Sequence, residues 1–426
     1  MYKQSKMSVE ISIHQRPSTS SHTATAQAVV VGAGPAGSAT ASALAQCGVD
    51  VLLLDKAAFP RDKTCGDGLT PRSVAVLQEM GLLPRLETAG ARRISGIRIV
   101  APAGCFVEVG FDELAGKLPP FSLTLPRRTL DALLLEHAQA AGARFMSRFR
   151  VQELVYKNGV IAGVQGIHKG EAALVHAPLT CLATGAAVLL VQKAGLLPTV
   201  PPPMRAARSY FGGLTELEPI FQFHFDRNLI PGYGWIFPLA GGRANVGVGC
   251  FPGRQFRPSP PRRPYEQFIN QNPLVGQQLT KATSDGPVKS YPLRTGFLSV
   301  KQTQRDGLLL VGEAAGLVNP LTGEGVDYAL ESGLMAAEVA AGALGEDTFS
   351  AGRLAVYGRR LHQRYGALFY YLTKMRQWYI RERVLNTVIR KAQYRPRLKY
   401  MFAHAALGLI DPKEGISLRT LRDIAF

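Results

Sequence analysis

Residues 29–37 read VVVGAGPAG, and residues 51–55 read VLLLD after an alanine-rich stretch. Short apolar runs that end at glycine or at an acid are typical of buried parallel strands. The alanine-rich stretch, from about Pro35 to Gln46, predicts a helix between the two strands. Strand, glycine turn, helix, strand and acid in this order predict a βαβ unit of a doubly wound α/β fold.

The glycine spacing in this turn suits a dinucleotide. Gly32 lets the chain turn sharply out of the strand, Gly34 lets the backbone approach a pyrophosphate, and Gly37 lets the helix pack on the sheet. The helix aims free N–H groups and the positive end of its dipole at the phosphates. Asp55, 18 residues after Gly37, is placed to accept from ribose hydroxyls. The alternative is a glycine-rich turn without a ligand.

Composition limits the class of protein. A chain of 426 residues has room for two or three domains, and a hydrophobic fraction of 46% fits a folded α/β protein. The cysteines are scattered without Cys-x-x-Cys spacing, which indicates a reducing, cytoplasmic compartment and argues against a metal site. They are Cys47, Cys65, Cys105, Cys181 and Cys250.

The formal net charge of +18 indicates an anionic partner. Much of the positive charge lies between residues 353 and 399, where Arg and Lys alternate with Tyr, Phe, Leu and Trp. One interpretation is amphipathic helices in peripheral contact with a membrane, and the other is a solvated basic face. No nucleic-acid-binding motif is found, so we expect no nucleic-acid partner. No apolar stretch is long enough to span a membrane.

A second glycine-rich loop follows the apolar strand predicted at residues 307–311. It covers residues 312–325 and opens onto a helix predicted from Val326 to Gly342. Small residues after a strand let a ligand come close to the backbone. Two such loops suit one long cofactor.

These motifs carry a resemblance to a known fold. The first turn with Asp55, the ATG strand end at 183–185 and the 312–325 loop together resemble the FAD-binding fold of aromatic hydroxylases and their relatives. KTCGDGL at 63–69 and YGWIFP at 233–238, followed by NVGVG at 245–249, are similar to the geranylgeranyl reductase family of FAD-dependent oxidoreductases.

The fold class predicted on these grounds is α/β, with a discontinuous Rossmann-like FAD-binding domain, an inserted β-rich substrate domain and a C-terminal helical region. The first residues are polar and predict a disordered extension, with organelle targeting as the alternative. The predicted bounds are 1–26 for the extension, 27–91, 127–199 and 301–345 for the FAD-binding domain, 92–126 and 200–300 for the substrate domain, and 346–426 for the helical region.

The resemblance implies FAD as cofactor and assigns roles to individual residues. Arg127 would reach the cofactor from the start of its helix, and the pair 312–313 would meet the ribityl chain. Relatives usually have Asp where this chain has Glu313. A flavin edge at the start of the helix near Gly325 would be favoured as an anion. The predicted cofactor-binding residues are Gly32, Ala33, Gly34, Pro35, Ala36, Gly37, Asp55, Lys56, Cys65, Gly66, Arg127, Gly185, Gly312, Glu313, Gly323 and Gly325.

Alternating aromatic residues predict one wall of a pocket. Tyr233, Trp235 and Phe237 share a face of their predicted strand, either as the wall of an apolar pocket or as a buried core strip. The resemblance implies that these three and Pro238 contact the substrate, and that Cys65, Tyr233 and Trp235 are the catalytic candidates. Cys65 is either a small packing residue or a residue beside the flavin that shapes the pocket or assists proton delivery.

The resemblance implies a reductase that saturates C=C bonds of an isoprenoid or similar apolar chain by hydride transfer from reduced flavin. No second nucleotide-binding turn is found, so the electron donor is either transiently bound NAD(P)H or a protein. The alternative is an FAD-dependent monooxygenase or halogenase acting on an aromatic natural product. Halogenases of this fold carry Trp-x-Trp-x-Ile-Pro, where this chain has Tyr233 and Phe237. A third reading, a flavin electron carrier without turnover, does not suit an enclosed aromatic strip.

Overall fold

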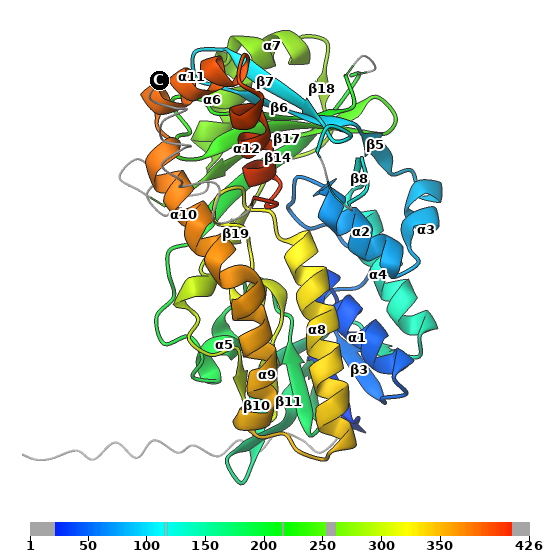
Figure 1. Ribbon diagram of the computed structural model, residues 1–426. Coiled ribbons are helices and arrows are strands. Elements are labelled where there is room, and N and C mark those ends of the chain that lie inside the picture. Colours follow the sequence, from blue (N-terminus) through cyan, green and yellow to red (C-terminus); the bar gives the residue numbers. More distant parts are fainter. Residues whose placement is uncertain (1–21, 115, 117, 215–216, 253–260, 411–426) are drawn as a thin grey trace, which may run out of the picture.

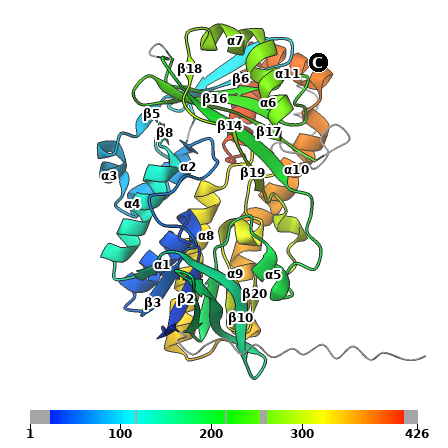
Figure 2. The ribbon, with the colours of Figure 1, turned by 180° about the vertical axis from the view of Figure 1, so that it is seen from behind.

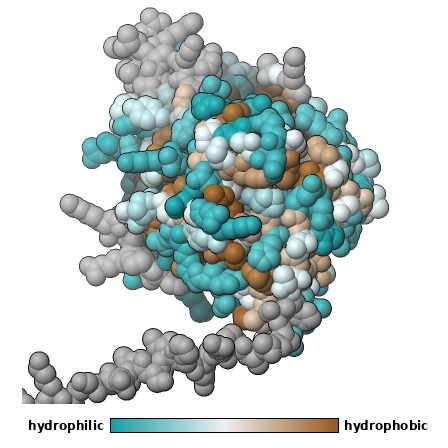
Figure 3. Space-filling model, turned by 90° about the horizontal axis from the view of Figure 1, so that it is seen from below, coloured by the Kyte–Doolittle hydropathy of each residue, from teal (hydrophilic) through white to brown (hydrophobic). Residues whose placement is uncertain are grey.

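The computed structural model of the protein describes residues 22–114, 116, 118–214, 217–252 and 261–410. Two lobes are stacked along the long axis, an α/β lobe below and a β-rich lobe above (Figure 1), and the same division is seen from behind (Figure 2). The α/β lobe is built on a six-stranded sheet and the β-rich lobe on an eight-stranded sheet. Seen from below, the α/β lobe presents interleaved hydrophilic and hydrophobic residues (Figure 3).

The six-stranded sheet has the order β20-β21-β13-β2-β3-β9. The five strands from β9 to β21 are joined by four parallel pairings, and β20 pairs antiparallel with β21 at one edge. Strands β2, β3, β13 and β21 are wholly buried, as expected of parallel strands covered on both faces. The strands are β2 (Ala28–Val31), β3 (Val51–Leu54), β9 (Arg144–Met146), β13 (Leu179–Leu182), β20 (Gln304–Arg305) and β21 (Leu308–Leu310).

Two helices of small residues pack closely in this lobe, α1 (Pro35–Gln46) and α8 (Val326–Gly345). A Cβ at Gly333 of α8 would lie 2.7 Å from the carbonyl oxygen of Ala36, so glycine permits this close packing. Helix α4 (Arg127–Ala140) contacts α1 from the other side. This packing fixes the N-terminus of α1 relative to the N-terminus of α8.

A four-stranded sheet completes the lobe, in the order β1-β12-β11-β10. These are β1 (His22–Thr25), β10 (Phe149–Lys157), β11 (Val160–His168) and β12 (Glu171–His176), and β11 contacts β13 of the central sheet. A short helix, α5 (Leu189–Lys193), contacts β10.

The eight-stranded sheet of the β-rich lobe joins strands from two parts of the chain, because β15 pairs in parallel with β6. The other pairings in it are antiparallel. Helices α6 (Arg262–Gln271) and α7 (Pro273–Leu279) help to cover one face. The strands are β6 (Gly96–Val100), β7 (Phe106–Gly110), β14 (Met204–Gly212), β15 (Ile220–His224), β16 (Tyr233–Leu239), β17 (Arg243–Cys250), β18 (Thr283–Ser284) and β19 (Lys289–Leu293).

A small third unit lies beside the two lobes (Figure 1). It is a three-stranded sheet of β4 (Gly68–Leu69), β8 (Ser122–Thr124) and β5 (Arg92–Ile94), packed with helices α2 (Pro71–Glu79) and α3 (Leu83–Thr88). Its apolar cluster is shared with helices α1, α4 and α8 of the α/β lobe.

The C-terminal helices run from the α/β lobe up to the β-rich lobe (Figure 1). They are α9 (Ala351–Leu361), the π-helical turn η3 (His362–Gly366), α10 (Ala367–Tyr379), α11 (Glu382–Ala392) and α12 (Pro396–Ala406). Helices α11 and α12 contact β7, so this segment ties the lobes together. None of the described helices is long and apolar enough to cross a membrane.

The predicted fold class is confirmed: the chain folds as α/β with a Rossmann-like sheet, a β-rich lobe and a C-terminal helical region. The disordered extension predicted for residues 1–26 is wrong from residue 22 onward, because residues 22–25 form β1 in parallel with β12. Residues 1–21 lie outside the described part of the chain. Helix α4 begins at Arg127.

Candidate functional site

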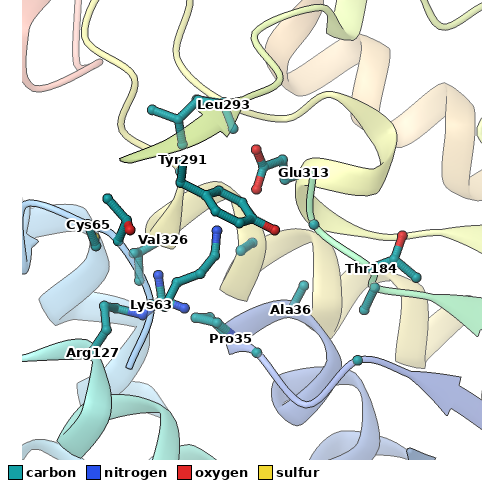
Figure 4. A pocket seen from close by; sticks show the side chains of 18 of the residues that line it. Pro35, Ala36, Lys63, Cys65, Arg127, Thr184, Tyr291, Leu293, Glu313 and Val326 are labelled. Carbon is teal, nitrogen blue, oxygen red and sulfur yellow. The ribbon is translucent and has the colours of Figure 1, made fainter. Parts of the chain in front are cut away.

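A cavity of about 890 Å³ lies where the lobes meet. It is lined by the turn from β2 into α1, the end of β3, the loop before β4, strand β16 and the loop before α8. Figure 4 shows Pro35 and Ala36 on one side of it and Cys65 and Arg127 on another. Both glycine-rich loops predicted to share one cofactor therefore open onto the same space.

The first turn leaves room for a phosphate. Gly32 has φ +107°, and a Cβ there would lie 2.4 Å from the carbonyl oxygen of Ala183, so only glycine fits. A Cβ at Gly34 would meet only Arg61 within 4 Å, at 3.7 Å, because this side faces the cavity. No described side chain caps the N-terminus of α1. An uncapped, buried helix start of this kind fits a pyrophosphate.

Three of the predicted cofactor residues lie behind the cavity wall. A Cβ at Gly37 would lie 1.8 Å from the carbonyl oxygen of Gly32, and one at Gly312 would lie 2.8 Å from the Cβ of Ala36. The backbone N–H of Ala33 donates to Asp55. None of the three lines the cavity. Close packing accounts for Gly37 and Gly312, and the cofactor contact predicted for the three residues stays a prediction.

Asp55 ends β3 at the cavity with only 8% of its surface exposed. Its Oδ2 accepts from the N–H of Ala33 at 2.9 Å, and its Oδ1 accepts from the N–H of Ala57 at 2.8 Å. These two bonds fix the carboxylate, and each oxygen keeps a lone pair for a ribose hydroxyl. Lys56 follows it and also lines the cavity. The geometry thus suits the role predicted for Asp55.

The loop that carries Cys65 is held by Asn245 of β17. The Asn245 amide nitrogen donates to the Cys65 carbonyl at 2.7 Å and to Asp67 Oδ2 at 2.8 Å, while its Oδ1 accepts from Trp235 Nε1 at 2.9 Å. Gly66 lies between these anchors and lines the cavity. The side-chain amide of Asn245 therefore helps to position both the loop that carries Cys65 and the indole ring of Trp235.

Asp67 is the buried hub of this network, with 1% of its surface exposed and a left-handed φ of +62°. It accepts from the N–H of Arg127 at 3.0 Å and from the hydroxyl of Tyr210 at 2.7 Å, besides Asn245. Burial raises the pKa of Asp67 above its usual range, and these donors oppose the rise. The sequence motif contained Asp67 and Asn245, but their roles were not predicted.

Cys65 and Arg127 both line the cavity. Burial raises the pKa of the Cys65 thiol, so the neutral form dominates near pH 7 and a nucleophilic role is disfavoured. The Arg127 guanidinium binds Asp131 through Nε at 2.7 Å and Nη2 at 2.8 Å, one helical turn away. Arg127 thus reaches the cavity as predicted, but with its charge already paired.

The aromatic wall comes from β16 and β15. Tyr233, Trp235 and Phe237 line the cavity with Phe221 and Phe223, although all five are also more than nine-tenths buried. Their rings touch, with centroids 4.5 Å apart for Phe221 and Phe237 and 5.3 Å apart for Phe223 and Tyr233. Tyr233 also donates its hydroxyl to the carbonyl of Thr322.

Pro238 does not belong to this wall. Strand alternation places it on the other side of β16, where its carbonyl accepts from the Thr124 hydroxyl at 2.6 Å. Pro238 does not line the cavity, so the predicted substrate contact is corrected.

The second loop brings Glu313, Gly323, Glu324 and Gly325 to the cavity, and Gly185 lines it nearby. Glu313 Oε1 accepts from the N–H of Arg294 at 3.0 Å. A Cβ on Gly185 would lie 3.3 Å from Glu313 Oε2. The Glu313 side chain, longer than the Asp usual in relatives, therefore fills the space between its own loop and the segment that carries Gly185.

Three further lining residues were missed in the sequence. Lys63 extends over the ring of Tyr291, with Nζ 3.6 Å from the ring centroid (Figure 4), and burial lowers the pKa of Lys63. Besides Lys63 and Tyr291, the third missed residue is Glu324. Burial, reinforced by Asp327, raises the pKa of Glu324 to about 8. Lys63 and Glu324 both stood inside quoted motifs, whereas nothing in the sequence linked Tyr291 to the site.

Comparison with known proteins identifies the class. A family model described as an FAD binding domain matches residues 25–364. The menaquinone reductase of Mycobacterium tuberculosis is 34% identical over 339 residues, which cover 74% of this chain and 76% of that protein. The digeranylgeranylglycerophospholipid reductase 2 of Methanopyrus kandleri is 34% identical over 359 residues, covering 81% and 84%.

Solved structures show the same fold. A geranylgeranyl bacteriochlorophyll reductase-like protein from Thermoplasma acidophilum superposes with a TM-score of 0.80 at 23% identity, covering 94% of this chain and 100% of that one. The myxobacterial chondrochloren halogenase has a TM-score of 0.69 at 21% identity, covering 92% and 99%. The chain belongs to the FAD-binding-domain flavoproteins and, among them, to the geranylgeranyl reductase family. It is an FAD-dependent oxidoreductase.

Proposed function

We propose that this enzyme reduces C=C double bonds of an isoprenoid or similar apolar chain. The observation that carries the proposal is the aromatic wall of β15 and β16, which faces the same cavity as the dinucleotide-binding turn. An apolar chain lying on these rings would share one water-poor space with the flavin. The names of the relatives, menaquinone reductase and digeranylgeranylglycerophospholipid reductase, support the same substrate class.

Bound FAD, once reduced, supplies a hydride. An isolated alkene is a poor electrophile, so the protein must align it closely and exclude water. The rings suited to this are fixed in place, because Asn245 holds the indole of Trp235 and the Thr322 carbonyl holds the hydroxyl of Tyr233. The residues that would hold the cofactor are those of the first turn, Asp55 and the loop before α8.

Anaerobic turnover tests the proposal. The flavin is reduced without oxygen, and a polyprenyl substrate such as geranylgeranyl diphosphate is added. We expect the flavin to reoxidise as the alkene is lost, measured by absorbance and by mass spectrometry. A strict requirement for oxygen would instead favour a monooxygenase or halogenase acting on an aromatic compound. Parallel trials of NADH, NADPH and reduced ferredoxin in the reductive half-reaction would identify the class of electron donor.

We also propose that the protein works in the cytoplasm at the surface of an anionic membrane. Tyr370, Lys374 and Trp378 stand one turn apart along α10. Tyr370 is 57% exposed and Trp378 is 46% exposed, and the Lys374 ammonium lies 5.4 Å and 6.0 Å from their rings. Exposed aromatic rings with a cation between them suit the headgroup region of a lipid surface. A lipid-tailed substrate would reach the enzyme from there.

A further inference from the structure

Glu324 is a carboxyl group in the cavity wall whose position the cofactor does not explain. It lies in the loop just before α8, where it is partly buried and lines the cavity. Its Oε1 accepts from the N–H of Val326 at 2.8 Å. No cation of the described residues forms an ion pair with it within 4.0 Å. Burial, reinforced by Asp327, raises the pKa of Glu324 to about 8, which favours the protonated acid near neutral pH.

The groups that face Glu324 come from four elements. Asp327 of α8 disfavours its negative form. Cys65 of the loop before β4, Tyr233 of β16 and Tyr328 of α8 are neutral near pH 7, and the charge of Glu324 helps to raise their pKa values. Arg127 of α4 favours the negative form, and this guanidinium shares the Asp131 carboxylate with Arg61. Burial is the largest influence and acts in the same direction as Asp327.

We propose that Glu324 is the catalytic acid that protonates the alkene during reduction. This inference rests on the proposed function. One alkene carbon would take a hydride, with its electron pair, from the reduced flavin. The π electron pair would form a C–H bond at the other carbon with the proton of Glu324, whose O–H bond breaks. The alkene is thus reduced and the flavin oxidised by two electrons, and water entering the cavity returns a proton to the carboxylate.

The alternatives in the wall are weaker candidates. Burial raises the pKa of the Cys65 thiol, and burial raises that of the Tyr233 hydroxyl well above its ordinary value, so both would release a proton less readily. Asp67 is a buried carboxyl too, but its oxygens accept from three donors and it does not line the cavity. A general acid works best when its pKa lies near the working pH, which favours Glu324. The N–H of Val326 at the start of α8 would stabilise the carboxylate left behind.

The test compares wild type with Glu324→Gln, which keeps an acceptor for Val326 but has no acidic proton. Glu338→Gln, on an exposed side of the same helix, is the matched control. We expect alkene-dependent reoxidation of reduced flavin to slow by about 100-fold or more in Glu324→Gln. Substrate affinity should stay unchanged. The wild-type rate should fall above about pH 8, a limb that the Gln variant lacks.

A second readout needs neither flavin nor substrate. The folded-state pKa of Glu324, about 8, lies above the ordinary value of about 4.3. The free energy of unfolding of the wild type should therefore fall as pH rises between these two values. The melting temperature of Glu324→Gln relative to wild type should therefore rise from about pH 4 to about pH 8 and then level off. Equal pH dependence in the two proteins would overturn the neutral-acid assignment.

The outcomes separate the two proposals. If wild type reduces the polyprenyl substrate and Glu324→Gln does so at the same rate, only the role of Glu324 is overturned. If wild type does not oxidise its flavin with any polyprenyl substrate, the proposed function fails, and the acid role fails with it. Partial activity in Glu324→Asp, which keeps an acid on a shorter side chain, would support the proposal.

Discussion

The side-chain amide of Asn245 donates to the Asp67 carboxylate at 2.8 Å, which fastens the sheet of the β-rich lobe to the loop at the flavin cavity. The same amide reaches the Cys65 carbonyl and the Trp235 indole, so it places one residue from each side of the cavity. Buried networks of this kind are costly to leave half-satisfied. Asn245, together with the hydroxyl of Tyr210 on Asp67, therefore sets the relative position of the loop and the aromatic wall.

Replacing Asn245 with Leu should loosen this contact. The indole N–H would lose its acceptor and Asp67 one of its donors, at a cost of about 1–3 kcal/mol in unfolding free energy. FAD affinity should fall with it, because the Cys65 loop loses its anchor. Urea unfolding and flavin titration measure the two effects. Asn270→Leu on the exposed side of α6 is the control, and equal losses in both variants would contradict the role of Asn245.

The first glycine turn offers a separable pair of variants. Gly32→Ala should destabilise the protein whether or not FAD is present, because its Cβ would overlap the Ala183 carbonyl and its φ of +107° is strained for alanine. Gly34→Ala should leave the apoprotein unchanged, since Gly34 has φ −80° and faces open space.

In Gly34→Ala the new methyl group would instead occupy the room left for the pyrophosphate, so FAD affinity should fall at least about tenfold, or about 1.4 kcal/mol. Melting curves of the apoproteins and flavin titrations check both variants. Unchanged FAD affinity in Gly34→Ala would mean that the cofactor does not lie against this turn.

How much the sequence could predict follows from the range of the interactions involved. Helix α1 was predicted with its observed bounds, because Pro35 and the flanking glycines are local signals. Strand β1 was missed, since it forms by pairing with strand β12, far along the chain. Asn245 was noticed as part of a motif, but its function depends on which strands and loops the fold brings beside it.

The site shows the same limit. The alternation that identified Tyr233, Trp235 and Phe237 also places Pro238 on the opposite face, so that error was avoidable from the sequence. Tyr291 was not predictable in this way, because it meets the cavity only through the pairing of β19 with β14.

The ion-pair network behind α8 should make the protein sensitive to strong acid. Glu331 receives bidentate hydrogen bonds from Arg72 and from Arg364. Burial alone would raise the pKa of Glu331, but these bonds outweigh it and lower the pKa to about 2. The stabilisation is complete above the ordinary pKa of about 4.3 and is lost as pH falls through about 2.

Glu331→Gln should therefore cost about 3–5 kcal/mol near neutral pH, because it leaves buried guanidinium charge unpaired. The difference from wild type should shrink in acid, which denaturant unfolding at several pH values measures. Glu346→Gln, at an exposed pair with Arg353, is the control and should leave stability nearly unchanged. A pH-independent loss in Glu331→Gln would contradict a role for its charge.

The exposed stripe on α10 makes the last prediction. Replacing both Tyr370 and Trp378 with Ala should lower binding to vesicles of anionic phospholipid by at least about tenfold, because two rings no longer enter the headgroup region. Sedimentation with vesicles measures the binding.

Added salt should weaken binding of the wild type to these vesicles, since Lys374 contributes by charge. Tyr394→Ala, at a site 82% exposed but outside the stripe, is the control. Reduction of a detergent-dispersed substrate should be unaffected in the double variant, because α10 carries no residue of the cavity wall. Equal vesicle binding by the double variant and wild type would place the membrane contact elsewhere or remove it.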